Sequence, residues 1–166
     1  MATFTLVHVV ISLIGIGSGF VVMTGFFSAK RLDGWTSIFL TSTALTSVTG
    51  FLFPFHKFMP SYVVAGLSLV ILAIAIMARY VRHLEGGWRT TYVVTSMIAF
   101  YFNCFVLVAQ LFAKVPALKA LAPTQSEPPF AIAQGILMLL FIWLSIRAVK
   151  GFRGLQTPSA ALKTAS

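Results

Sequence analysis

Five apolar segments, each about 20 residues long, constrain this chain more than any other feature of its sequence. A helix needs roughly 20 apolar residues to cross a bilayer core, and lipid cannot bond to unpaired backbone groups. The segments cover about residues 4–27, 35–53, 60–80, 91–112 and 129–149. The sequence therefore predicts an all-α fold, an integral membrane bundle of five transmembrane helices.

The composition supports a chain that is surrounded by lipid. Hydrophobic residues make up 58% of the 166 residues, and charged residues only 9%. Soluble domains carry about 25% charged residues, so this chain has too few to cover a water-facing surface. We expect residues 1–153 to form one transmembrane domain, and residues 154–166, rich in Ala, Ser and Thr, to form a flexible tail.

Basic residues are divided unequally between the two sides of a five-span arrangement. One side holds Lys30, Arg31, Arg79, Arg82, Arg89, Arg147, Lys150, Arg153 and Lys163. The other side holds Lys57, Lys114 and Lys119. The positive-inside rule then predicts an N-terminus outside the cell and a C-terminus in the cytoplasm. These residues form no amphipathic groove, so we expect no nucleic-acid binding.

Small residues and buried polar groups indicate how the helices pack. Lipid removes the hydrophobic drive between helices, so close backbone approach and hydrogen bonds must hold them together. In the first segment, a small-residue face comprises Ser12, Gly15 and Gly19, and internal packing is favoured over homodimerisation. We expect four polar side chains to face the bundle interior as interhelical contacts: Ser42, Thr46, Ser96 and Asn103.

Several polar residues fall in the predicted outer half of the membrane. They are His8, His56, Gln110, Glu127 and Gln134. Histidine and carboxylate side chains ligate metals, two facing histidines hold haem b, and amides bind quinones. These residues lie on different segments without a local ligand spacing, so packing or anchoring is the favoured role. We expect no cofactor, with haem b, a metal or a quinone as the alternatives.

On the predicted inner side, Arg79, Arg82 and Arg89 surround a Gly-Gly-Trp loop. Arginine side chains near helix ends can extend to the interface and meet anionic lipid headgroups. We therefore predict that these three residues bind headgroups, in addition to fixing the topology.

Two runs resemble a known group of proteins. Residues 46–56, TSVTGFLFPFH, and residues 121–130, LAPTQSEPPF, are similar to small multi-helix bacterial inner-membrane proteins with no known activity. The likeness extends through most of the five spans. It implies a multi-pass protein of the bacterial inner membrane and implies no functional residues.

No sequence motif indicates a reaction. The chain has no GxSxG, HExxH or P-loop pattern and no paired carboxylates within a span. We expect a non-catalytic accessory or partner-binding subunit, associating with other membrane proteins or with itself. One alternative is a redox or ligand-binding protein with its site in the outer half. Another is a small-solute channel or carrier lined by Ser42, Thr46, Asn103 and Gln110.

Overall fold

The computed structural model describes residues 2–52 and 60–153, and within these ranges every regular element is a helix. Seven elements follow one another: α1 (Ala2–Phe27), α2 (Asp33–Phe51), α3 (Pro60–Ile76), the π-helix η1 (Met77–Val81), α4 (Trp88–Lys114), α5 (Pro116–Leu121) and α6 (Pro128–Phe152). The prediction of an all-helical fold is therefore confirmed.

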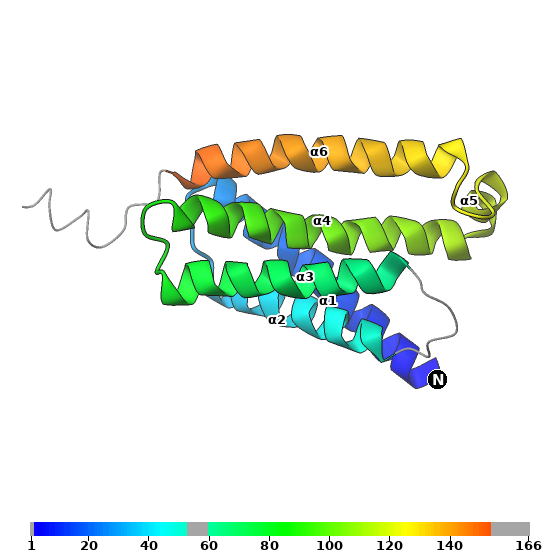
Figure 1. The fold of residues 1–166 in the computed structure, drawn as a ribbon, viewed down its shortest axis with the longest axis horizontal. Coiled ribbons are helices and arrows are strands. Elements are labelled where there is room, and N and C mark those ends of the chain that lie inside the picture. Colours follow the sequence, from blue (N-terminus) through cyan, green and yellow to red (C-terminus); the bar gives the residue numbers. More distant parts are fainter. Residues whose placement is uncertain (1, 53–59, 154–166) are drawn as a thin grey trace, which may run out of the picture.

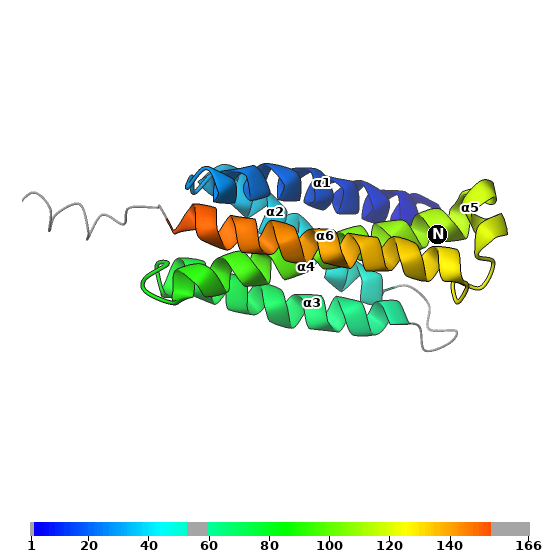
Figure 2. The ribbon, with the colours of Figure 1, turned by 90° about the horizontal axis from the view of Figure 1, so that it is seen from above.

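The five long helices run side by side, alternating in direction (Figures 1 and 2). We call the end where α1 and α6 finish and α2 and α4 begin the basic end, because it carries most of the described Lys and Arg residues. The short helix α5 lies at the opposite end and was not predicted. Pro116 occupies its first turn, where a missing N–H costs nothing.

Four of the described helices are long and apolar enough to cross a membrane. These spans are Thr3–Phe27, Tyr62–Val81, Trp88–Lys114 and Pro128–Phe152. The chain thus has the character of an integral membrane protein. The predicted second span is not among the four: α2 begins at Asp33 and is rich in Ser and Thr, which lowers its hydropathy.

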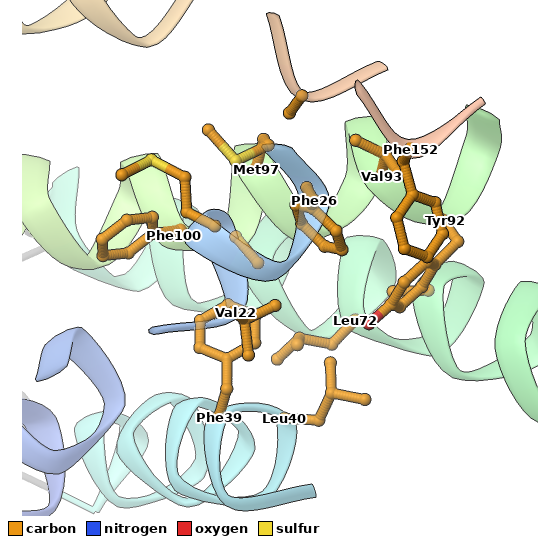
Figure 3. Packing of buried hydrophobic residues seen from close by; sticks show 14 of the residues in the cluster. Val22, Phe26, Phe39, Leu40, Leu72, Tyr92, Val93, Met97, Phe100 and Phe152 are labelled. Atoms are coloured by element: carbon orange, nitrogen blue, oxygen red, sulfur yellow. The ribbon is translucent and has the colours of Figure 1, made fainter. Parts of the chain in front are cut away.

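Aromatic rings form much of the core near the basic end (Figure 3). Phe26 of α1 lies 5.5 Å from the ring of Tyr92 on α4 and 5.2 Å from that of Phe152 on α6. Nearer the middle, Phe100 of α4 meets Phe39 of α2 and Phe141 of α6 in edge-to-face contacts. Such pairs contribute about 0.5–1.5 kcal/mol each beyond their buried area.

The small-residue face of α1 packs inside the bundle. A methyl group added at Gly19 would lie 2.6 Å from the Phe100 ring, closer than van der Waals contact allows. A methyl group at Gly15 would lie 3.3 Å from Ser42 Oγ and 3.4 Å from Asn103 Nδ2. Both glycines therefore bring α1 close to α2 and α4.

Packing of α6 is uneven along its length. At the basic end a methyl group on Gly151 would lie 2.8 Å from the Phe26 carbonyl oxygen of α1, so the two backbones nearly touch. Toward the N-terminal end of α1, the helices α1 and α6 diverge (Figure 1). Only 11% of the most apolar stretch of α6 is buried, against 50% for α4. Helix α6 therefore contacts α4 along its length, through Phe130, Gln134 and Phe141, and lies against α1 at the basic end.

Candidate functional site

The most unusual side chain in the described structure is Arg79, a charged residue that is 1% exposed. It lies in η1, at the basic end of the bundle. An arginine withdrawn from water is unfavourable unless its charge and its donors are satisfied. The surrounding residues should therefore show what this site is built to hold.

Three groups from different parts of the chain bind the Arg79 guanidinium. Nη2 pairs with Asp33 Oδ1 on α2 and also donates to the Arg31 carbonyl oxygen, at 3.2 Å. Nη1 donates to Tyr92 Oη on α4, at 3.0 Å. Tyr92 in turn donates to Thr36 Oγ1, at 3.4 Å. The network joins η1, α2 and α4.

Local backbone geometry brings these groups together. The N–H of Arg82 bonds to the Met77 carbonyl five residues earlier, so this turn is wider than an α-turn. Such π-turns are frequent at functional sites. Leu32, just before α2, has φ of 43°, an uncommon left-handed conformation for leucine. Leu32 lies between Arg31 and Asp33, and both of these neighbours contact Arg79.

The side of Asp33 away from Arg79 remains open to the surroundings, with 72% of its side chain exposed. Arg31 Nε lies 3.6 Å from the same carboxylate oxygen. The Arg79 guanidinium also makes a cation–π contact, since its central carbon lies 5.1 Å from the centroid of the Tyr92 ring. The arrangement holds a fixed positive charge and can clamp three helical elements at one depth.

This placement corrects the predicted headgroup role of Arg79. Its side chain points into the bundle and does not extend to the interface, because Asp33 and Tyr92 supply partners there. Arg82 is exposed and lies over the Trp88 ring, at 5.1 Å. Arg89 is partly exposed, and its Nη1 donates to the Arg153 carbonyl oxygen. Headgroup binding by Arg82 and Arg89 stays a prediction.

The predicted outer-half residues are used in separate contacts. His8 Nδ1 lies 2.8 Å from Thr49 Oγ1, which joins α1 to α2. Gln134 Nε2 donates to the Phe105 carbonyl oxygen at 3.1 Å, which joins α6 to α4. Gln110 is exposed on α4. His56 lies outside the described residues.

Glu127 organises the turn before α6. Its carboxylate accepts hydrogen bonds from Thr124 Oγ1 at 2.8 Å and from the backbone N–H groups of Thr124 and Ser126. Partial desolvation acts to raise the pKa of Glu127, but these hydrogen bonds outweigh it, so the pKa lies below its ordinary value.

In residues 2–52 and 60–153 no three His, Cys, Asp or Glu side chains converge as metal ligands.

The polar residues predicted in the bundle interior make one clear interhelical bond. Asn103 Nδ2 donates to Thr43 Oγ1, at 2.9 Å, across α4 and α2. Ser42 is buried but donates to the Ile38 carbonyl of its own helix, and Ser96 is 1% exposed. Thr46 is partly buried.

Sequence reasoning missed Asp33, Thr36 and Tyr92 as members of a site. A usable signal was present: Asp33 is an acidic residue at the start of one helix, and Arg79 is a basic residue near the end of another antiparallel one. Ends of antiparallel neighbours meet at one depth, so such residues can pair.

Comparisons of the chain with protein-family models, with curated proteins and with solved structures found no match.

Proposed function

We propose that this chain is a non-catalytic subunit of a membrane assembly, and that it binds a transmembrane helix of a partner protein between α1 and α6. The separation of α1 from α6 in the half of the bundle opposite the basic end is the observation that carries this proposal (Figure 1). At the basic end Phe26 of α1 contacts Phe152 of α6, whereas toward the start of α1 the two helices diverge.

Apolar residues on three helices support this position for the partner. Leu13 of α1 is 52% exposed, Leu111 of α4 is 41% exposed and Leu140 of α6 is 46% exposed. Further toward the basic end, the equivalent faces are buried by Phe26, Phe100 and Phe152. A helix inserted beside α1 would complete this half by van der Waals packing, the main source of association in lipid.

The proposal includes five spans, with the N-terminus outside. Helix α2 lies alongside both α1 and α3 (Figure 1), so it must cross the bilayer if they do. The hydroxyl groups of Ser42, Ser47 and Thr49 bond to carbonyls of the preceding turn, which lowers the cost of placing them in lipid. Lys114 and Lys119 lie at the end opposite the basic end.

The side of the membrane on which each turn lies can be measured with single introduced cysteines. The one natural cysteine, Cys104, is first replaced by alanine. A cysteine at Ser126, in the turn before α6, should react with an impermeant maleimide added to intact cells. A cysteine at Glu85, exposed in the η1–α4 turn, should react only after the membrane is opened. The reverse pattern would overturn the orientation. We further propose the bacterial inner membrane as the location, which membrane fractionation tests.

Partner binding can be tested with a photo-crosslinking amino acid at Leu13 or Leu111. The full chain is irradiated in its native membrane and then purified in mild detergent. We expect a single adduct of defined mass at both positions. Leu67, which is 48% exposed on α3, serves as the matched control and should give none. Equal labelling at all three positions would show non-specific protein contact, and no protein adduct at any of them would show that lipid alone covers this face; either result would overturn the proposal.

A further inference from the structure

A groove of about 310 Å³ opens between α2 and α3, near the basic end. It is unrelated to the surface proposed for a partner helix, which lies between α1 and α6. Its volume is at the lower end of the range for ligand pockets, about 300–1,000 Å³. Its lining residues Leu45, Ile76 and Tyr80 are exposed at the surface of the bundle, so the groove faces lipid when the helices lie in a bilayer.

The lining changes in polarity along the groove. Ser37 and Tyr80 provide hydroxyl groups at the part nearest the basic end, and Ser37 Oγ lies 3.4 Å from Tyr80 Oη. One turn deeper, Thr41 and Ile76 lie at the same depth, and beyond them Ala44 and Leu45 line the groove without polar side-chain atoms. This order matches a phospholipid, whose glycerol and ester groups lie near the interface and whose acyl chain extends inward.

The charge around the polar part selects among phospholipids. Asp33 lies one turn before Ser37 and carries the nearest negative charge, but Arg79 and Arg31 both pair with it. Lys30 and Arg82 are exposed at the same end. Arg79 and Arg31 are already used to neutralise Asp33, so Lys30 and Arg82 face one further exposed carboxylate, Glu85. The remaining balance is positive and favours an anionic headgroup, with about 1 kcal/mol from each exposed basic residue near the surface.

We propose that this groove is a binding site for an anionic phospholipid, with one acyl chain against Ala44 and Ile76 and the phosphate near Ser37, Tyr80 and Arg82. The site would attach a lipid of the inner leaflet to α2, the helix with the lowest hydropathy of the five.

Thermal unfolding of the full chain in neutral detergent tests this, with phosphatidylglycerol, phosphatidylcholine or inorganic phosphate added. We expect phosphatidylglycerol to raise the melting temperature more than the other two. Ala44→Phe fills the groove and should weaken the apparent affinity by about tenfold or more. Gly17→Phe adds the same ring in open space on α1 and should leave the affinity unchanged.

A second pair of variants tests the charge. Arg82→Gln should weaken phosphatidylglycerol binding about fivefold and leave phosphatidylcholine binding unchanged. Arg147→Gln, on the exposed surface of α6, is the matched control. If Ala44→Phe does not fold, Ser37→Ile narrows the exposed part of the groove and should reduce affinity in the same way.

Three results would overturn the proposal. Equal stabilisation by both phospholipids would remove the charge selection. A full response in Ala44→Phe or Ser37→Ile would remove the groove as the site of the acyl chain. Stabilisation by inorganic phosphate equal to that by phosphatidylglycerol would show a headgroup site alone.

Discussion

Asp33 and Arg79 form an ion pair in which the arginine side chain is sealed inside the bundle and the carboxylate is 72% exposed. The pair is therefore asymmetric. Removing the carboxylate leaves a buried charge short of its partner, whereas removing the arginine leaves a carboxylate that water or Arg31 can satisfy.

This asymmetry predicts that Asp33→Asn destabilises the protein by about 1.5–3 kcal/mol, the contribution of a hydrogen bond to a charged group. Arg79→Met should cost less, because it leaves no uncompensated charge in the interior. Unfolding titrations in mixed detergent micelles would measure both. Glu85→Gln, an exposed carboxylate in the adjacent turn, is the control and should change little. The opposite ranking of Asp33→Asn and Arg79→Met would contradict the asymmetry of the pair.

Two glycines of α1 should respond differently to the same substitution. Gly19→Ala places a methyl group against Phe100, whose ring is held by Phe20, Phe39 and Phe141, and should destabilise the protein by about 1–3 kcal/mol. Gly17→Ala meets nothing within 4 Å and should be neutral or slightly stabilising. Melting temperatures of the two variants make the comparison. Similar losses at both positions would show that helix flexibility, and not packing, requires glycine here.

The Asn103–Thr43 bond should contribute about 0.6–2 kcal/mol of coupling between α4 and α2. A double-mutant cycle with Asn103→Leu and Thr43→Val isolates that coupling. Thr95→Val combined with Asn103→Leu is the matched control, because the Thr95 hydroxyl bonds to the Thr91 carbonyl of its own helix. A coupling energy near zero in the first cycle would mean that the amide bond does not join the helices.

The turn around Glu127 should depend on pH in a defined direction. Because its pKa is lowered in the folded protein, the Glu127 carboxylate stabilises the turn at pH values above its ordinary pKa and loses that contribution as the pH falls through the lower folded pKa. The amide resonances of Thr124 and Ser126 should therefore shift together in an acid titration followed by NMR, with a midpoint below the ordinary pKa of a glutamate. In Glu127→Gln the two amides should show no such transition. A midpoint at or above the ordinary value in the unaltered chain would contradict the hydrogen-bonded turn.

The apolar segments predicted the long helices well because hydrocarbon leaves a backbone few alternatives. The predicted span 91–112 is contained in α4 (Trp88–Lys114), and 129–149 is contained in α6 (Pro128–Phe152). Helix ends were less accurate, since local bonds decide them. The first residue of α2 is Asp33, before the predicted start at 35, because the Thr36 N–H already bonds to the Leu32 carbonyl oxygen.

The candidate sites were much less accessible to sequence reasoning. His8 and Gln134 were grouped because both fall in the outer half, yet each bonds to a different neighbouring helix. The depth of a side chain in the membrane follows from its position along a segment. That position does not fix the direction in which the side chain points or the helix that it contacts.

The sequence by itself determined the helical class and the alternation of apolar segments with basic turns, since both follow from burying backbone groups in lipid. Only the tertiary structure decided that Arg79 is enclosed by Asp33 and Tyr92, that Gly19 receives Phe100, and that α6 meets α1 at the basic end while the two helices diverge beyond it. These features depend on helix rotation and crossing, which small differences in side-chain packing control when the surrounding lipid is as apolar as the helices.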